Sequence, residues 1–575
     1  MGDANLSRRR FLEKMAPAGG SVRIEPVSPL PAEDLFKVDE HAFSNRQLTL
    51  QGGLDPYQGP WTQAQAAHLL RRTTFGVKYA QVQQLLALGN AQAAVDAILN
   101  VPTTPPDPPI NNYNSPNSVP PYADPNVPSG QTWINAPYDV EAEGFRIESW
   151  RGWWLNRMIE GEANIQEKMT LFWHNHFATQ TDAVFRGKAA YLHNAMLRRN
   201  ILGNFRTFVK EVTLDPLMLV FLNGFRNNLI APDENYAREL QELFTIGKDT
   251  QQGYTEDDVV AAARVLTGWT VDINGTVTFV PQLHDQGFKV FSSFYGNTII
   301  QGSNNGSAEL DALINMILQK EEVSLYISRK LYRFFVYYEI NQDVEANVIV
   351  PMAQIFRDNN YEIKPVVKAL LQSEHFFDAV NKGCMIKNPL DMLVGMLRNY
   401  NLTLPAPTLL DNYSIRLGIN YYCNALQMMP GSPPNVAGWS AYRQIPTYYR
   451  NWISADTIRN RNIISDVMAF GGVDVGPEKL FINHIAFAAQ FPNPGDPNAL
   501  IDNTLAILHP MPISTLKKFY LKSILLSGQL SDHYWTDAWN AYVNNPSDPM
   551  AAQAVWFRLA TMHKYIMNLA EYQLS

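Results

Sequence analysis

The amino-acid sequence predicts a mainly α-helical protein, a large multi-helix globular body that carries a small β-hairpin or short antiparallel sheet as an insert. Hydrophobic residues make up 46% of the 575 residues and charged residues 17%, which is a globular composition. From residue 61 onward, apolar residues recur mostly at helical spacing, and strict alternation is confined to the stretch 269–300. No series of alternating strands and helices is present, so a parallel-sheet fold is not expected.

The chain is expected to contain one large helical domain, residues 61–575, preceded by an extended arm over 21–60 and a leader over 1–20. The arm is predicted because Pro, Gly and Asp occur there without a sustained period. Inside the domain, residues 101–140 are rich in Pro and Asn and are predicted to form a long loop or an inserted arm.

The leader contains Ser-Arg-Arg-Arg-Phe-Leu-Glu-Lys at residues 7–14, which has the pattern of a twin-arginine export signal. Such a signal needs an apolar stretch after the arginines, and Glu13 and Lys14 interrupt that stretch. The motif therefore predicts export to the periplasm or cell surface. The alternative is a basic leader on a cytoplasmic protein.

Helices are predicted wherever apolar residues are spaced by about 3.6 positions. Thr62 is expected to cap the first helix, and Thr255 to Asp258 have the pattern of a capping box. That box begins a helix that runs to Leu266 and ends before Gly268. The other predicted helices cover 63–72, 79–88, 91–99, 141–160, 163–177, 187–199, 204–212, 215–222, 233–246, 308–319, 322–337, 343–358, 362–373, 388–400, 416–428 and 453–468, and helices are expected to continue from there to the C-terminus.

The β insert is predicted from two alternating runs, 269–273 and 276–280, on either side of Asn274-Gly275. Asn-Gly between alternating runs is a strong signal for a tight hairpin. A further short strand over 289–294 is expected to join the hairpin.

Charge and composition exclude several classes of protein. The net charge of -8 argues against a nucleic-acid-binding protein, which usually carries a basic face. No apolar run approaches the roughly 18 residues of a membrane span. Two cysteines, Cys384 and Cys423, could form at most one disulfide, and the sequence does not decide whether they do. The motifs of phosphate-loop enzymes, α/β-hydrolases and zincin proteases are missing.

His174 and His176 invite a metal hypothesis, but the surrounding spacing is helical, so the two rings point in different directions. His176 lies on the apolar face of the predicted helix. Two interpretations stay open for it: a buried histidine hydrogen-bonded to a backbone carbonyl, or a functional group that acts with another partner.

The segment 233–246 carries polar residues beside a buried face. Glu239 and Glu242 are three positions apart and close enough to share a cation or a proton. Arg238 and Glu242 could instead pair on a solvated face, with Asn235 beside them.

Two further candidates follow in the chain. His284-Asp285, with Lys289 nearby, occupies a loop after the hairpin, and loops on a rigid scaffold often carry function. The run from Pro433 to Trp439 predicts a rigid turn in which Gly438 permits a tight bend, with an aromatic wall of a ligand site as the alternative.

Several of these stretches, in this order, resemble the bacterial family described as domain of unknown function 1800. The matching motifs are the runs at 68–76, 168–177, 235–247, 253–258, 262–269, 284–287 and 433–439. The resemblance covers about residues 63–470 and implies an exported protein, often accompanied by a partner that resembles sulfatase-like proteins. It implies no established activity.

These candidate residues are expected to converge on one pocket, and two functions for the protein stay open. In the first, the protein binds or assembles with a partner. In the alternative, it is a metal-assisted hydrolase or a related enzyme whose divalent ion is zinc, manganese or iron. The residues predicted to be catalytic are Glu239, Glu242, His284 and Asp285; those predicted to hold the metal are His176, Glu239, Glu242 and His284; those predicted to bind a ligand are His68, Arg71, Asn235, Arg238, Lys289 and Trp439.

Overall fold

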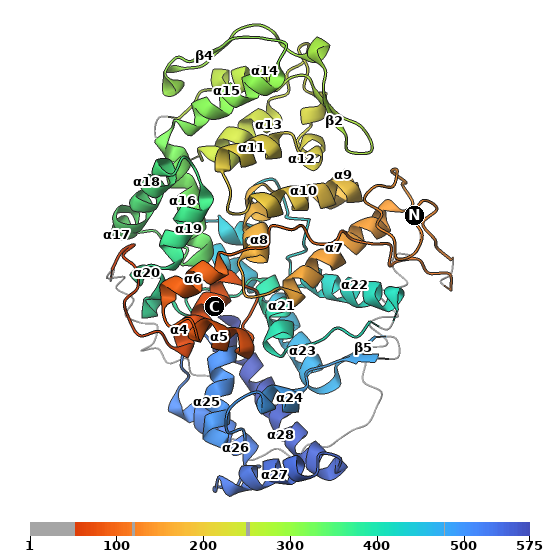
Figure 1. The fold of residues 1–575 in the computed structure, drawn as a ribbon, viewed down its shortest axis with the longest axis vertical. Helices are drawn as coiled ribbons and strands as arrows, with labels where there is room; N and C mark the ends of the chain where they lie inside the picture. The colour runs from red at the N-terminus through yellow and green to blue at the C-terminus, as the bar shows by residue number, and fades with distance from the viewer. Residues whose placement is uncertain (1–51, 118–120, 249–252, 407, 476–477) are drawn as a thin grey trace. The chain divides into compact units, whose positions relative to one another are not determined.

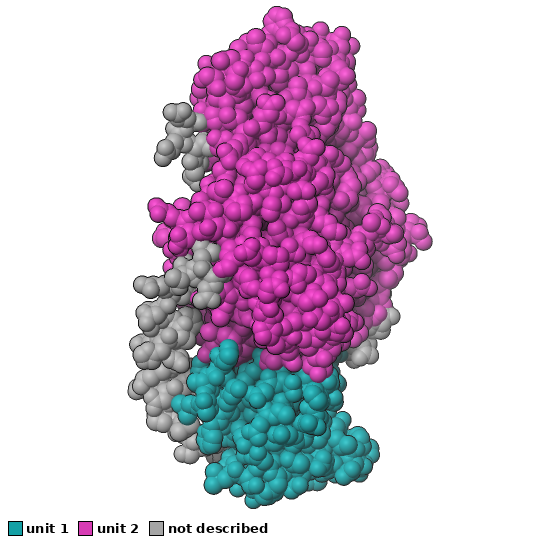
Figure 2. All heavy atoms as spheres, turned by 60° about the vertical axis from the view of Figure 1, so that its left-hand side comes forward, with its two compact units in different colours: residues 1–47, 462–505, 512–569 teal, residues 48–461, 506–511, 570–575 magenta. Residues whose placement is uncertain are grey.

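A computed structural model describes residues 52–117, 121–248, 253–406, 408–475 and 478–575. The predicted leader and most of the predicted arm lie outside these residues. Within the range expected to form one helical domain, the chain divides into two compact units, which Figure 2 colours separately. The larger unit comprises 48–461, 506–511 and 570–575, and the smaller unit comprises 462–505 and 512–569.

The first part of the larger unit is a set of packed helices, in agreement with the apolar spacing. Helix α8 packs against α10, and α10 packs against α7 (Figure 1). Three tryptophans, Trp150, Trp154 and Trp173, are fully buried among these helices. The helices are α4 Gln63–Thr73, α5 Tyr79–Leu86, α6 Ala91–Ile98, α7 Glu143–Glu160, α8 Gln166–His176, α9 Thr181–Val184, α10 Gly187–Asn200, α11 Phe205–Thr213, α12 Pro216–Phe221, α13 Glu234–Glu239 and α14 Glu256–Val265.

The predicted capping box is confirmed at the start of α14, where the Thr255 side chain accepts from the Asp258 N–H and Asp258 accepts from the Thr255 N–H. Helix α13 continues as a π-helical turn, Leu240–Thr245. Such turns are rare and widen the helix, so backbone carbonyls become available to side chains. One of these carbonyls, that of Phe244, contacts His176.

The predicted hairpin is confirmed as β1 Trp269–Val271 and β2 Val277–Phe279, with Thr270 opposite Thr278. The expected third strand is present but does not join it. Strand β3, Lys289–Val290, pairs with β4, Ile299–Ile300, because the chain turns back through Gly296, which has a φ of 67°. A third two-stranded sheet in the smaller unit, β5 Val473–Val475 and β6 Glu478–Leu480, was not predicted.

The rest of the larger unit is again helical. Helix α22 begins at Leu409, earlier than the predicted 416, because the Thr408 side chain caps it by accepting from the Asp411 N–H. The helices are α15 Gly306–Leu318, α16 Glu321–Phe335, α17 Gln342–Val344, the π-turn Glu345–Ile349, α18 Val350–Asp358, α19 Ile363–Leu371, α20 Glu374–Phe377, α21 Pro389–Asn399 and α22 Leu409–Ala425, followed by the 3₁₀ turns Ser440–Tyr442 and Tyr448–Trp452.

The smaller unit is a helical bundle in which α28 packs against α24, α26 and α27. Helix α23, Ala455–Asp466, leads into it, and α25 contributes to both units. The remaining bounds are α24 His484–Ala489, α25 Pro497–Leu508, α26 Thr515–Leu525, α27 His533–Asn544 and α28 Pro549–Asn568.

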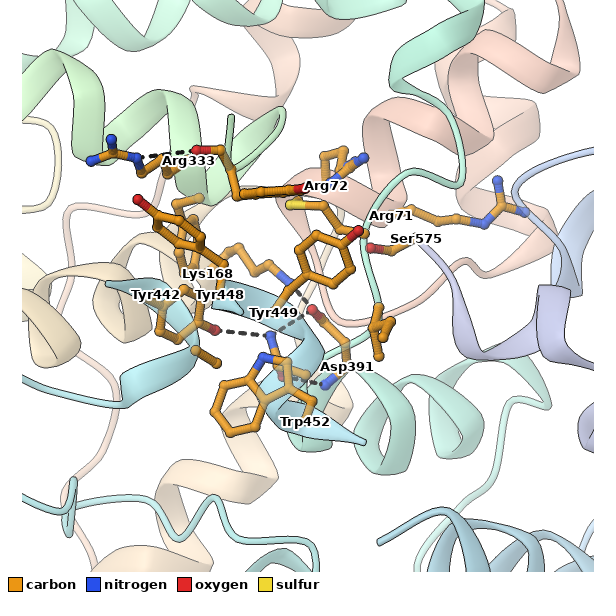
Figure 3. A pocket seen from close by; sticks show the side chains of 16 residues that line it. Arg71, Arg72, Lys168, Arg333, Asp391, Tyr442, Tyr448, Tyr449, Trp452 and Ser575 are labelled. Carbon is orange, nitrogen blue, oxygen red and sulfur yellow. Dashed lines mark hydrogen bonds and ion pairs between the residues drawn. The ribbon is translucent and has the colours of Figure 1, made fainter. Parts of the chain in front are cut away.

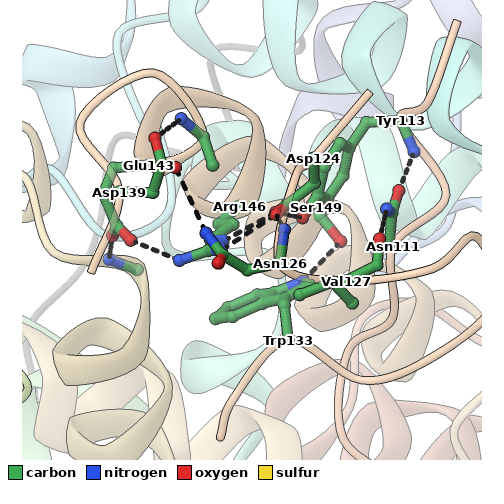
Figure 4. Close-up of polar contacts among 12 residues, drawn as sticks. Asn111, Tyr113, Asp124, Asn126, Val127, Trp133, Asp139, Glu143, Arg146 and Ser149 are labelled. Carbon is green, nitrogen blue, oxygen red and sulfur yellow. Dashed lines mark hydrogen bonds and ion pairs between the residues drawn. The ribbon is translucent and has the colours of Figure 1, made fainter. Parts of the chain in front are cut away.

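The Pro/Asn-rich segment 101–140 is an inserted arm whose described residues pack on helix α7 (Figure 4). The Asp124 carboxylate accepts from Arg146 Nε at 3.0 Å and from the Tyr113 hydroxyl at 2.8 Å, and all three side chains are buried. The Asn111 amide donates to the Val127 carbonyl at 2.8 Å. Side chains thus replace the backbone hydrogen bonds that a segment without regular secondary structure lacks.

Candidate functional site

A cavity of about 40 Å³ lies in the larger unit, between the C-terminal end of α4, the first turns of α8 and α21, the end of α16 and the segment 440–452 (Figure 3). Its charged lining is mostly positive. The lining comprises Arg71, Arg72, Lys168, Arg333, Phe334, Tyr338, Met385, Ile386, Asn388, Asp391, Ala441, Tyr442, Tyr448, Tyr449, Trp452 and Ser575. By volume, the cavity can hold a few waters or one compact polar group.

Arg71 and Arg72 are neighbours at the end of α4, and both are buried. Arg72 donates from Nη2 to the Asn381 carbonyl at 2.8 Å and contacts Cys384 Sγ at 3.1 Å. Its Nε and Nη1 have no hydrogen-bond partner among the described residues, although they are shielded from solvent. Within the described ranges, Arg71 donates only to backbone carbonyls. Neither guanidinium has a carboxylate partner in the described part of the chain.

Burial, with a smaller contribution from the adjacent Arg72, lowers the pKa of Arg71 to about 9. A lowered arginine pKa indicates that too few hydrogen bonds and opposite charges surround the guanidinium to stabilise its charged form. A buried cation without a partner costs several kcal/mol, so this pair of arginines is a place where an anion would be stabilised.

Lys168, from the first turn of α8, forms an ion pair with Asp391 on α21. Asp391 also accepts from the Asn388 amide at 2.7 Å, and Asn388 donates to the Tyr442 hydroxyl at 3.2 Å. Burial lowers the pKa of Lys168, and Asp391 opposes that effect. The carboxylate that lines the cavity is therefore already engaged by Lys168 and Asn388.

Aromatic rings form one side of the cavity. The Tyr338 ring lies 5.1 Å from that of Tyr448 and 5.0 Å from that of Tyr449, and Tyr442 packs edge-on against Trp452 at 5.8 Å. Such rings offer faces for stacking as well as hydroxyl groups for hydrogen bonding.

Lys168 also lines a second, roomier cavity of about 280 Å³ in the same unit. Its charged groups are balanced: Arg198 pairs with Glu167, and Arg157 pairs with Glu160. This cavity has space, but its lining does not favour one sign of charge.

The predicted site residue His176 is buried, and it contacts a backbone carbonyl as its first interpretation expects. Its Nε2 lies 3.0 Å from the Phe244 carbonyl, and its Nδ1 lies 3.0 Å from Lys330 Nζ. A carbonyl only accepts, so Nε2 carries the hydrogen and Nδ1 presents its lone pair to Lys330. Both ring nitrogens are thus engaged.

Glu239 and Glu242 lie near each other, as predicted, on the segment where α13 becomes a π-turn. Burial raises the pKa of Glu239, and the nearby Glu242 raises it further. Glu242 pairs with Lys248 at 2.7 Å. Arg238 reaches mainly Glu256, at 2.7 Å, so this face is largely an ion-pair network at the surface. Asn235, also predicted to bind a ligand, donates to the Leu222 carbonyl at 3.4 Å.

His284, Asp285 and Lys289 form a separate network. Asp285 pairs with Arg264 at 2.6 Å. His284 Nε2 lies 3.1 Å from the Glu309 carboxylate, which Lys289 also contacts at 2.5 Å. Burial alone would raise the pKa of Glu309, but the hydrogen bonds from Lys289 and His284 outweigh burial and hold that pKa below its usual value.

The structure therefore does not gather the four predicted metal ligands around one point. No group of three or more His, Cys, Asp or Glu side chains within the described ranges is arranged to hold a metal ion. The reason is local pairing. His176 contacts the Phe244 carbonyl and Lys330, and His284 contacts the Thr267 carbonyl as well as Glu309. A catalytic role for Glu239, Glu242, His284 or Asp285 stays a prediction.

The remaining candidates are buried. His68 contacts the Phe376 carbonyl at 3.0 Å. Trp439 lies in the predicted rigid turn, where Gly438 has a φ of 78° and an added Cβ would lie 2.4 Å from the Asn175 side chain. The cysteines Cys384 and Cys423 are both free.

A model of the family described as "Protein of unknown function (DUF1800)" matches residues 68–574, nearly the whole chain. The chain belongs to the DUF1800 family. No curated protein and no solved structure matches this DUF1800 protein. No helix in the described part of the chain is both long and apolar enough to span a bilayer.

Arg71, which the sequence predicted to bind a ligand, lines the cavity of this DUF1800 protein. The other lining residues Arg72, Lys168 and Asp391 were not among the predicted site residues. Arg72 and Lys168 belong to motifs that carry the family resemblance, at 68–76 and 168–177. Membership of these two family motifs was the signal in the sequence that could have marked both residues as site candidates. Asp391 lies 223 positions from Lys168, and nothing local indicates that pairing.

Proposed function

We propose that this DUF1800 protein is a binding protein that takes a small anionic ligand into the cavity between α4, α8, α16 and α21. One observation carries the proposal: Arg72 is a buried guanidinium in the cavity wall with two unpartnered nitrogens and no carboxylate partner among the described residues. An oxyanion such as phosphate or carboxylate would accept charge-assisted hydrogen bonds there.

The charge distribution supports an anion. The protein as a whole is acidic, with a net charge of -8, yet four cationic residues line a cavity whose one acidic side chain, Asp391, is already paired. The four cations are Arg71, Arg72, Lys168 and Arg333. A local positive potential on an acidic protein attracts and selects anions. The tyrosine and tryptophan wall favours a ligand whose anionic group is attached to a flat or apolar part.

We favour a binding function over a metal-assisted hydrolase because the described residues include no group of three or more side chains arranged to hold a metal ion. The hydrolase is tested separately: stoichiometric zinc, manganese or iron in the purified protein, lost in Glu239→Ala, would support it.

Calorimetric titration at low ionic strength with inorganic phosphate and phenylphosphate tests the binding proposal. We expect both anions to bind, with phenylphosphate binding more tightly because its ring adds contact with the aromatic wall. Arg72→Met should weaken phenylphosphate binding at least tenfold, since a hydrogen bond to a charged group contributes about 1.5–3 kcal/mol.

Arg199→Met is the matched control, because Arg199 is exposed and paired with Glu211, and it should leave the affinity unchanged. Arg333→Gln, at a half-buried position in the same wall, replaces Arg72→Met if that variant does not fold. Heat signals no larger than those of sodium chloride at equal ionic strength, or equal affinities for variant and wild type, would overturn the proposal.

Export and a sulfatase-like partner are part of the same proposal, and they rest on the arginine motif at residues 7–14 and on the family resemblance. Fusing residues 1–40 to a reporter tests the export signal. A reporter retained in the cytoplasm would count against it.

A further inference from the structure

Lys330 on helix α16 occupies an unusual environment for a lysine. Its Nζ lies 3.0 Å from His176 Nδ1 and 4.8 Å from the centre of the Tyr326 ring. It has no carboxylate partner among the described residues, and its side chain keeps partial contact with solvent. The cations that act on it are Arg333, one turn further along α16, and Arg443.

His176 is fixed as a proton acceptor toward this amine. Its Nε2–H donates to the Phe244 carbonyl in the π-turn that follows α13, so the lone pair of Nδ1 faces Lys330. The arrangement has three parts: an amine, a base within hydrogen-bond distance, and a group that orients the base. This is the geometry by which proteins activate a weak nucleophile.

Burial and the nearby positive charges both lower the pKa of Lys330. Burial, with smaller contributions from Arg333 and Arg443, lowers the pKa of Lys330 to about 7. An ordinary lysine has a pKa near 10.4 and is almost wholly protonated at neutral pH. An amine that is partly unprotonated can attack an electrophile.

We propose that Lys330 is a nucleophilic amine that condenses with the carbonyl group of a small anionic aldehyde or keto acid, with His176 as the proton acceptor. The amine nitrogen attacks the carbonyl carbon, the new C–N bond forms, and the carbonyl electron pair moves to oxygen, which takes a proton. His176 Nδ1 accepts the proton lost from nitrogen. Loss of water then gives the imine, so amine plus carbonyl becomes imine plus water without an oxidant or reductant.

An anionic carbonyl compound is the expected class because the positive charges of Arg333 and Arg443 act on the amine. Arg333 also lines the Arg72 cavity, but the two proposals are tested separately, because this one is read from the labelling of Lys330. Lys387 provides a comparison within the chain, because burial lowers its pKa to about 7 as well. Its Nζ donates to the Tyr572 carbonyl at 2.6 Å, as that of Lys330 does to the Leu243 carbonyl at 3.5 Å, but no imidazole among the described residues is bonded to it.

The experiment is reductive trapping on the full-length protein. The protein is incubated with glyoxylate at pH 7.5, reduced with cyanoborohydride, digested and mapped by mass spectrometry. We expect the adduct at Lys330 to form at least ten times faster than at Lys364, an exposed lysine, and faster than at Lys387. Acetaldehyde, which is uncharged, should label Lys330 more slowly than glyoxylate does.

His176→Asn tests the role of the imidazole. Labelling of Lys330 should fall about tenfold at pH 7.5 and recover at pH 10, where hydroxide removes the proton, while labelling of Lys364 stays unchanged. A merely structural role for His176 would not give this recovery. If His176→Asn does not fold, the wild-type pattern decides: labelling of Lys330 no faster than that of Lys364 would overturn the proposal.

Discussion

Lowering the pH from 7.5 to 5.5 is expected to reduce the free energy of unfolding of the larger unit by about 5 kcal/mol. Burial lowers the pKa of His174 to about 3 and that of His375 to about 4, and it holds the pKa values of His68 and His176 well below their usual range. In the unfolded chain these groups titrate near pH 6.5.

The direction follows from proton linkage. Below about pH 6.5 the unfolded state binds protons that the folded state cannot accept, so stability is fully present above that pH and is lost as the pH falls. Each histidine contributes about 1.3 kcal/mol over this interval, because one unit of pH corresponds to about 1.4 kcal/mol per proton.

Urea unfolding followed by tryptophan fluorescence at pH 7.5, 6.5 and 5.5 measures this effect. His375→Gln should reduce the pH dependence by about a quarter, since an amide can still accept the hydrogen bond from the Tyr332 hydroxyl but does not titrate. Equal unfolding midpoints at pH 7.5 and 5.5 would show that the buried histidines do not control acid stability.

Arg146→Met is expected to lower the free energy of unfolding by about 3–5 kcal/mol, because it leaves buried carboxylates without their cation. Arg146 contacts Asp124 at 3.0 Å and Glu143 at 3.0 Å, and its side chain is 2% exposed. The same change should free the inserted arm 101–140 for cleavage by protease.

Arg157→Met is the matched control on the same helix. The Arg157 and Glu160 side chains are 36% and 56% exposed and lie 3.5 Å apart, so their pair contributes less than about 1 kcal/mol. Comparable losses in Arg146→Met and Arg157→Met would contradict the assignment of Arg146 as the anchor of the arm.

The local elements of the fold were predictable because their causes are local. The capping box at Thr255 and the Asn274-Gly275 hairpin each depend on residues a few positions apart, and both are confirmed. The pairing of β3 with β4 was missed because it depends on a turn at Gly296 that the alternating pattern does not mark. Composition suggested a long loop or an arm at 101–140, but not that Asp124 would meet Arg146.

The site was harder to predict because its contacts join distant parts of the chain. Spacing along the helix placed Glu239 beside Glu242 and His176 on a buried face, and both positions are found. The partners that decide what these side chains can do are Lys330 for His176 and Glu309 for His284, 154 and 25 positions away. No pattern in a single sequence indicates such pairings.

The inserted arm determines which segments of this protein tolerate a deletion or an insertion. A segment rich in proline and asparagine is usually a surface loop that can be deleted without loss of stability. In this protein the side chains of Trp133 and Asp124 in that segment are buried. Shortening it would remove part of the core rather than a surface loop. An affinity tag is better inserted near Leu530, between α26 and α27, where the side chain is 91% exposed.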